Sequence, residues 1–347
     1  MNARSRSRTI ALALLVVLAV AGVGVAGALA AGGAPSLDLP SVAANDLVAS
    51  TLRAAESGHP ISGSVATHVD LGLPQISPSM SGGQAAVEWV LGDQRFKVWS
   101  SPEGLRVSQL LPFAERVFVG SRTDVWTWSS DRELAVHSSV DPSTGRELSR
   151  DLTSSLGDPV RLADKLVRVA SGIAEVRVVA PQEVAGRATY TLELTPTSAA
   201  TKIGRIDVAI DAETRLPLRV QVFPHGSADP AVEAGFCSVD FGPIDPSMFT
   251  FTPPPGATVK QADLAPPPGA DAGSSEGSSA TGPRLLGNGF GTVVAVPVSN
   301  PPQELDSILP FEGPLGSAEL VHTGGATWLV AGAVDLQQLN EAASKLA

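Results

Sequence analysis

The chain has little cysteine and histidine for its length, and each shortage excludes a class of site. Cys237 is the only cysteine among 347 residues, so a disulfide within the chain is excluded and the fold must be held by its core. It lies in an alternating run and is interpreted as a small residue of a strand. None of the five histidines lies at helical or hairpin spacing from another histidine or from Cys237, which disfavours a metal site built from a local motif.

The sequence also lacks the short motifs of common catalytic and nucleotide-binding sites. It has no HExxH, CxxC or P-loop pattern, and no GxGxxG that opens a helix. His68 and Asp70 are two residues apart and could share a strand face, but such a pair is weak evidence for catalysis. We therefore predict no catalytic residue, cofactor or metal, and an enzyme of envelope chemistry is the least favoured alternative.

Positive charge is scarce beyond the first residues. The formal net charge is −11, although the chain opens with Arg4, Arg6 and Arg8. An acidic chain of this kind disfavours nucleic acid as a partner, because phosphate binding needs a basic surface. The charge says little about neutral or apolar ligands.

The basic start is followed by a long uncharged run. Residues 10–31 contain no charged side chain, and Ala28-Leu29-Ala30 closes the run with small residues. This layout predicts a secretory signal peptide over residues 1–31, or an uncleaved N-terminal membrane anchor because the run is nearly long enough to span a bilayer. Both alternatives place the remainder outside the cytoplasm, secreted or in the cell envelope, and tethered to the membrane if the segment is kept.

The rest of the chain is predicted to be rich in short strands. Helices are expected over 39–56 and 158–170, where apolar residues recur at helical spacing. Elsewhere, alternating residues bounded by Gly, Pro, Asp or Ser predict an antiparallel meander, with a turn at Gly92-Asp93 and one face of each strand in water. The expected strands cover 61–71, 84–91, 95–98, 104–111, 114–119, 124–129, 133–138, 174–183, 187–195, 204–211, 217–224 and 231–241.

The end of the chain has a different composition. Residues 253–283 are rich in Pro, Gly and Ser and predict a linker. Strands over 291–298 and 319–334, the latter turning at Gly324-Gly325, and a helix over 336–346 are expected to form a segment too thin for an independent core, docked on the main domain or a partner. The predicted organisation is a leader (1–31), a main domain (39–260), a disordered linker (261–284) and a small αβ segment (285–347).

Aromatic residues are few but gather in the first strand-rich stretch. Trp126 and Trp128 are two residues apart and are expected to share a face. For any single residue, ordinary core is the simpler interpretation. Taken together, a long sheet with only two helices to cover it predicts an apolar hollow suited to a ligand. The residues predicted to line this cavity are Trp89, Leu91, Phe96, Val98, Leu105, Val107, Phe118, Trp126, Trp128, Tyr190, Leu192, Leu194, Ile206, Val208, Ile210, Val220 and Phe236.

Three stretches in the second half resemble a known family. They are VAGRATY at 184–190, IDVAID followed by Thr214 and LPLR within 206–219, and DFG followed by FTF and PPGA within 240–257. With them, residues 39–260 resemble the LolA-like family of lipoprotein and lipid carriers, in the form common among actinobacterial secreted proteins. The family is related to the N-terminal domain of the RseB and MucB regulators.

The resemblance implies a fold and two functions. The fold is of the α+β class: a curved antiparallel sheet forming an unclosed half β-barrel covered by helices. The implied function is reversible binding of lipid or lipoprotein acyl chains in a hydrophobic cavity. The alternative is a regulatory module, similar to RseB and MucB, that senses lipid or envelope state and binds an anti-sigma factor or another membrane protein partner.

Overall fold

The computed structural model describes residues 38–72, 92–121, 123–139, 172–262, 284–298, 301, 305, 308–323 and 325–346. The leader, the strand expected at 84–91, the helix expected at 158–170 and residues 263–283 of the linker lie outside the described residues. So do Trp89 and Leu91 of the predicted cavity.

Most of the described chain belongs to one large sheet. Its strands follow the order β12-β6-β5-β4-β3-β2-β1-β11-β10-β9-β8-β7, with β12 and β7 at the two edges. All neighbours pair antiparallel except β12, which joins β6 in parallel. The sheet is therefore unclosed, as predicted. Its strands are β1 (Ile61–Val69), β2 (Gly92–Ser101), β3 (Gly104–Leu111), β4 (Ala114–Ser121), β5 (Asp124–Ser129), β6 (Leu134–Ser139), β7 (Ala174–Val184), β8 (Arg187–Pro196), β9 (Ile203–Asp211), β10 (Pro217–Pro224), β11 (Val232–Asp240) and β12 (Thr258–Gln261).

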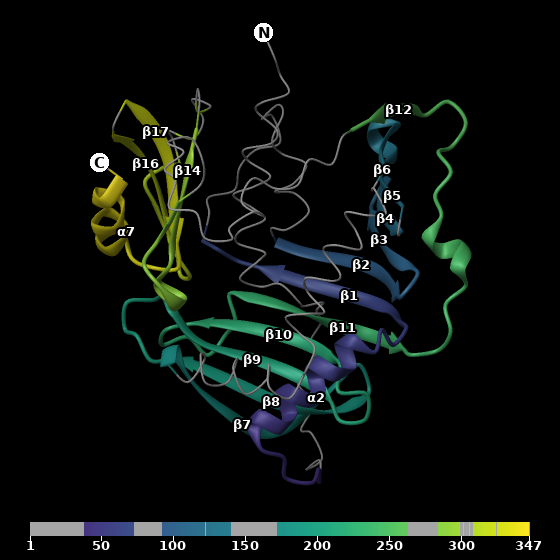
Figure 1. Ribbon diagram of the computed structural model, residues 1–347, viewed down its shortest axis with the longest axis horizontal. Helices are drawn as coiled ribbons and strands as arrows, with labels where there is room; N and C mark the ends of the chain where they lie inside the picture. The colour runs from purple at the N-terminus through teal and green to yellow at the C-terminus, as the bar shows by residue number, and fades with distance from the viewer. Residues whose placement is uncertain are drawn as a thin grey trace.

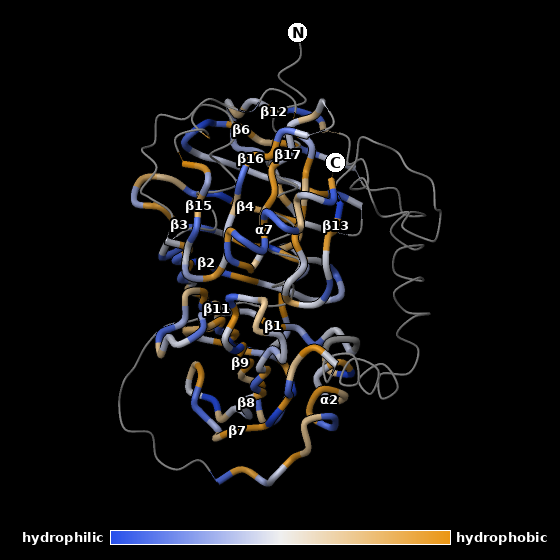
Figure 2. Tube along the Cα trace, turned by 90° about the vertical axis from the view of Figure 1, so that its left-hand side faces the viewer, coloured by the Kyte–Doolittle hydropathy of each residue, from blue (hydrophilic) through white to orange (hydrophobic). Residues whose placement is uncertain are grey.

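The sheet is strongly curved. In Figure 1, β1, β2, β10 and β11 cross the middle of the molecule, β3 to β6 rise on one side, and the C-terminal strands stand on the other. Figure 2 shows hydrophobic and hydrophilic residues alternating along many of the strands, as expected for sheet faces in different environments.

Helix α2 (Ala44–Glu56) covers one face of β7, β8 and β9. Its fully buried Leu47 packs with Tyr190, Leu192 and Ile210 in one core cluster. The helix was predicted to begin at residue 39, but it begins at Ala44. Residues 38–43 are not helical, as expected for residues around Pro40, and the Tyr190 hydroxyl donates a hydrogen bond to the Pro40 carbonyl oxygen (3.0 Å).

A second core cluster lies where the strands curl together. Its buried members include Val65, Val98 and Phe236 from the middle of the sheet and Ala209 from β9. Along β9, Ala209 belongs to this cluster whereas Ile210 belongs to the α2 cluster. The expectation that each strand keeps one face in water is therefore wrong for β9, because the curvature of the sheet buries both of its sides.

A long segment after β11, residues 246–261, crosses one face of strands β3 to β6 and ends in β12. We call this segment the strap. It begins with the 3₁₀ helix η2 (Pro246–Phe249) and is visible beyond β3 to β6 in Figure 1. Part of the predicted linker is thus a strand. All four residues of β12 expose their side chains, so only backbone pairing to the edge of β6 orders them, and composition does not reveal such pairing.

The turn expected at Gly92-Asp93 is not found, because both residues belong to a strand. Both residues begin β2 and pair with Val69 and His68 of β1. His68 Nδ1 lies 2.8 Å from a carboxylate oxygen of Asp93 on the neighbouring strand, and Asp70 accepts from the Gly72 N–H instead.

The C-terminal residues form a separate five-stranded sheet, which we call the C-terminal module. Its order is β13-β14-β17-β16-β15, and α7 (Leu336–Ala343) packs on it. Trp328, Val330 and Leu339 are at the centre of its own core. The other elements of the module are β13 (Arg284–Leu286), η3 (Gly289–Gly291), β14 (Val293–Pro297), β15 (Phe311–Glu312), β16 (Ser317–Thr323), β17 (Ala326–Gly332) and η4 (Ser344–Leu346). In the main domain, the 3₁₀ helix η1 (Ser130–Arg132) connects β5 to β6. Within the described part of the chain, the helices are too short or too polar to cross a bilayer.

Candidate functional site

The two faces of β2 to β5 differ in what covers them. Val98 pairs with Val107, and Val107 pairs with Phe118, so these three side chains form a ladder on one face. We call this the inner face, because it lies opposite the strap. Leu105 is on the same face and keeps 37% of its surface exposed, whereas Val107 and Phe118 are half-buried.

The predicted tryptophan pair lies on the other face. Trp126 pairs with Val119, the neighbour of Phe118, and therefore points away from the inner face. Trp126 and Trp128 do share a side, as expected, and both rings lie within 6.3 Å of the Phe251 ring of the strap. The strap covers them, so the structure does not bring them together with the rest of the predicted cavity.

The remaining predicted residues fall into groups along the sheet. One group packs around α2, a second lies in the central cluster, and single residues lie elsewhere. The α2 group is Tyr190, Leu192, Leu194, Val208 and Ile210; the central group is Phe96, Val98, Val107 and Phe236; Ile206 packs toward the C-terminal module; and Val220 is half-buried beside Val208 in register. The first group contacts α2 directly, whereas Leu105 and Phe118 lie beyond both clusters.

Sequence reasoning missed two polar residues on the inner face. Gln109 and Arg116 pair with each other in register and are almost fully buried. Gln109 accepts no hydrogen bond at Oε1, while its amide donates to Gln94 (2.6 Å). Arg116 lies 3.8 Å from Asp131. The position of Gln109 two residues after Val107 was the available signal, since strand residues two apart share a face.

The perturbed carboxyl groups have structural partners. Burial alone would raise the pKa of Asp211, but hydrogen bonds from Arg187 and Thr214 outweigh it, and the net pKa lies below its usual value. A side-chain hydrogen bond from Thr123, followed by one from His137, lowers the pKa of Asp124. No three His, Cys, Asp or Glu side chains cluster as metal ligands within the described residues.

The C-terminal module meets the large sheet through polar and apolar contacts. The backbone N–H of Lys202 donates to the Ala333 oxygen (2.7 Å), and its Nζ lies 2.6 Å from a Glu312 carboxylate oxygen. Leu315 of the module packs with Ile203 and Ala231 in a shared cluster. The module is therefore docked on the main domain, one of the two expectations from sequence.

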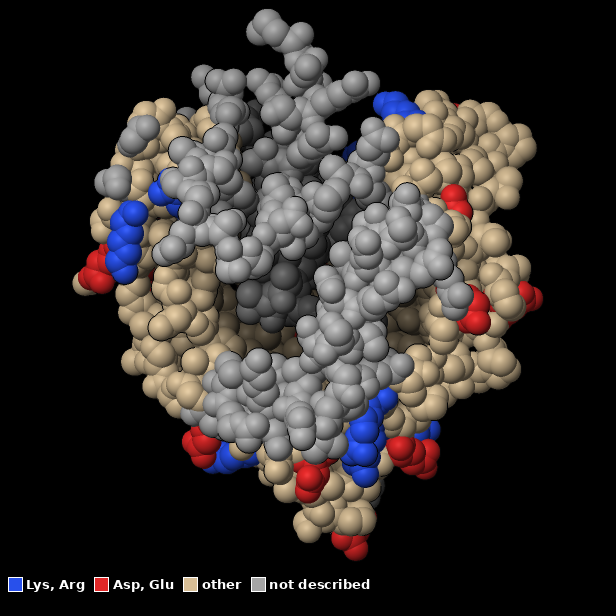
Figure 3. All heavy atoms as spheres, in the orientation of Figure 1, with Lys and Arg blue, Asp and Glu red and all other residues tan. Residues whose placement is uncertain are grey.

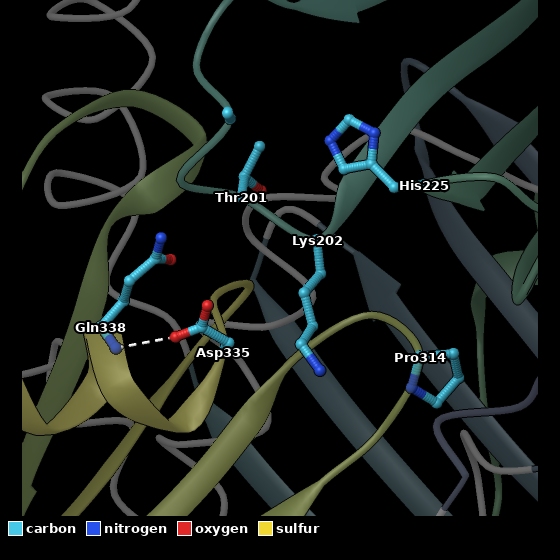
Figure 4. Close-up of a pocket in the computed structure, with 7 residues that line it drawn as sticks. Thr201, Lys202, His225, Pro314, Asp335 and Gln338 are labelled. Atoms are coloured by element: carbon cyan, nitrogen blue, oxygen red, sulfur yellow. Dashed lines mark hydrogen bonds between the residues drawn. The ribbon is translucent and has the colours of Figure 1, made fainter.

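A polar pocket of about 280 Å³ lies at this junction. Figure 4 shows Thr201, Lys202 and His225 on one side and Asp335 and Gln338 on the other. Asp335 caps α7 by accepting from the Gln338 N–H (2.8 Å), and Lys202 forms an ion pair with Glu312. These polar groups serve the junction, so the pocket offers less to a ligand than the inner face does.

In one view of the molecule, the Lys, Arg, Asp and Glu side chains of the described residues lie around the perimeter (Figure 3). The ladder on the inner face consists of apolar side chains, which favour an apolar ligand over an ionic one.

No protein-family model matches the sequence, and no curated protein matches it either. Several solved structures are similar to the chain. Pseudomonas aeruginosa MucB, in complex with MucA, is 13% identical and has a TM-score of 0.45, with 86% of this chain and 96% of that chain covered. The Mycobacterium tuberculosis lipoprotein LppX is 11% identical, with a TM-score of 0.30 and coverages of 58% and 96%.

A LolA superfamily protein from Nitrosomonas europaea is also similar, with 11% identity, a TM-score of 0.20 and coverages of 85% and 96%. The similar structures thus include the group that the sequence resemblance named. All three TM-scores are below 0.5, so the functional proposals depend on the residues of this chain.

Proposed function

We propose that the protein is an extracytoplasmic carrier that reversibly binds the acyl chain of a lipid or lipoprotein on the inner face of the large sheet. The observation that carries the proposal is the ladder of Val98, Val107 and Phe118. Val107, Phe118 and the neighbouring Leu105 leave apolar surface accessible, with Leu105 37% exposed, whereas Val98 is buried beneath them. An extended hydrocarbon chain can lie along such a ladder without any charged contact.

The energetics suit a ligand that must be released. Burying one methylene group is worth about 0.8 kcal/mol, so roughly ten methylenes give about 8 kcal/mol before the costs of binding. This corresponds to a Kd near the micromolar range at best. A carrier needs affinity of this order, because much tighter binding would prevent delivery.

The site supports binding better than catalysis. In the buried polar pair beside the ladder, Gln109 donates to Gln94 and Arg116 lies near Asp131. A nucleophile held against a base is what hydrolysis of a lipid ester would require. We therefore propose transport without chemical change, and place the protein outside the cytoplasm on the strength of its predicted leader.

Extraction and titration test the proposal. The full chain is purified, its bound lipids are extracted and identified by mass spectrometry, and the lipid-free protein is titrated with a fluorescent fatty acid. The double variant Leu105→Ser/Phe118→Ser should weaken binding by about tenfold or more, because two large apolar contacts are lost.

Leu285→Ser is the matched control, because Leu285 is 71% exposed on β13 in the C-terminal module. It should bind the fatty acid like the unmodified chain. A lipid-free protein that also rejects the fatty acid would contradict the carrier proposal. If that protein were instead crosslinked to a membrane protein, the regulatory alternative would be favoured.

A further inference from the structure

The tip of the β3–β4 hairpin presents apolar side chains to solvent. The segment reads Leu110-Leu111-Pro112-Phe113, with Pro112 and Phe113 in the two-residue turn. Phe113 is fully exposed and Leu110 is 58% exposed. Single exposed apolar residues are common. Two large ones within four residues at a hairpin turn form an apolar surface that a binding partner can cover.

The tip is held firmly with respect to the inner face. β3 and β4 pair without interruption from Gly104 and Ser121 to Leu111 and Ala114. Leu111 lies on the same side of β3 as Val107, since residues separated by an even number share a face. Gln109 lies between Val107 and Leu111 on this face and pairs with Arg116, so the inner face reaches the base of the tip across a buried polar pair. Leu110 points to the opposite face of β3.

The chemistry of the tip fits a lipid bilayer. The four residues carry no charge, and the first charged side chain beyond them is Glu115, which pairs in register with Leu110 at the base of the tip. The turn itself can therefore enter the interface while Glu115 stays at the level of the headgroups. Pro112 has no backbone N–H, which removes one donor that would otherwise lose its water. Arg116, the nearest basic residue on β4, is almost fully buried beside Asp131 and does not hold the tip in water.

We propose that this hairpin tip inserts into the interface of a lipid bilayer. Its function there, loading or delivering an acyl chain along β3, depends on the carrier function proposed above; the insertion itself does not. A bilayer is favoured over a protein partner because Pro112 and Phe113 form a small apolar turn, with Glu115 as the one charged side chain paired beside it.

Depth-dependent quenching tests the insertion in the full chain, whatever the fate of its leader. In a Cys237→Ser background, Phe113→Cys is labelled with an environment-sensitive fluorophore and mixed with phosphatidylcholine vesicles. The label should be quenched by spin labels on the acyl chains and protected from iodide in water. A matched label at Leu285→Cys should show the reverse, and Leu110→Ser should weaken the acyl-chain quenching at position 113.

Transfer of a fluorescent lipid from vesicles separates this proposal from the carrier function. Leu110→Ser/Phe113→Ser should slow transfer by roughly tenfold or more, given the apolar area removed. Its affinity for a monomeric fatty acid in solution should not change. Equal iodide access at positions 113 and 285 would overturn the insertion. If the unmodified chain does not bind the fatty acid, the carrier function alone is overturned.

Discussion

Among the residues that the structure describes, Asp211 stands out for the number of hydrogen bonds that its carboxylate accepts. Its side chain is 1% exposed and accepts two hydrogen bonds from Arg187, at 2.5 and 3.0 Å. The Thr214 N–H and hydroxyl donate to the same carboxylate at 2.7 and 2.8 Å. This one carboxylate therefore links the β9–β10 turn to the first residue of β8.

Removing the charge of Asp211 should destabilise the fold. We expect Asp211→Asn to lower the free energy of unfolding by about 2–3 kcal/mol, because a buried carboxylate that pairs with arginine loses its charge. Urea denaturation at pH 7 measures the change. Glu213→Gln is the matched control: Glu213 also contacts Arg187 but is 81% exposed, so it should cost about 0.5 kcal/mol or less.

The same residue gives stability a pH dependence. The folded-state pKa of Asp211 lies below its usual value. Its stabilising contribution is therefore fully present above the unfolded pKa of about 3.9 and is lost as the pH falls through the lower folded pKa. The difference in unfolding free energy between the natural chain and Asp211→Asn should shrink below about pH 4. A constant difference down to acid unfolding would contradict this assignment.

Individual residues also show how far the sequence could be interpreted. The turn at Asp211 to Thr214 was predictable, because Asp and Thr bond their own backbone locally. The pairing of Asp211 with Arg187 was not, because the partner comes from another strand. Likewise, alternation placed Trp126 and Trp128 on one face but did not tell which face the strap would cover.

Among the elements, the strap is the least predictable from sequence. Its aromatic contacts hold it on the outer face of β3 to β6: Phe249 is buried near Gly104, and Phe251 lies 5.6 Å from the Trp126 ring. The bounds of β3, β5 and β10 were predicted correctly, since turn residues flank alternating runs. No such pattern marks β12, whose four residues are bound through their backbone alone.

Removing one aromatic ring of the strap should uncover the tryptophans beneath it. We expect Phe251→Ala to increase the quenching of tryptophan fluorescence by iodide and to lower the unfolding free energy by about 1–3 kcal/mol. Phe113→Ala is the matched control, because it removes a ring that is already exposed. The added quenching should vanish when Trp126 and Trp128 are both replaced by Phe. Unchanged iodide access in Phe251→Ala would show that the strap does not shield the pair.

For the whole molecule, the C-terminal module and the β3–β6 side of the sheet stand on opposite sides of the central strands (Figure 1). The module has its own buried core around Trp328 and Val330. Its place was left open by the sequence, which predicted β14, β16, β17 and α7, but not β13 or β15, and allowed docking on a partner instead. The residues that decide this, Lys202 and Leu315, lie far apart in the chain, so only the fold brings them together.

The position of the module should depend on its apolar contact. Leu315 is buried against Ile203 and Ala231, so Leu315→Ser should weaken docking by about 2 kcal/mol or more while the core around Trp328 stays folded. Spin labels at Asp229→Cys and Gln337→Cys, in a Cys237→Ser chain, report the separation of the two parts. We expect a narrow distance distribution in the parent and a broad one in the variant.

Leu285→Ser should leave the distribution narrow, because Leu285 points into solvent. Unchanged near-ultraviolet circular dichroism would show that the module itself is intact, and a narrow distribution in Leu315→Ser would assign docking to Lys202 and its bonds to Glu312 and Gly313 instead.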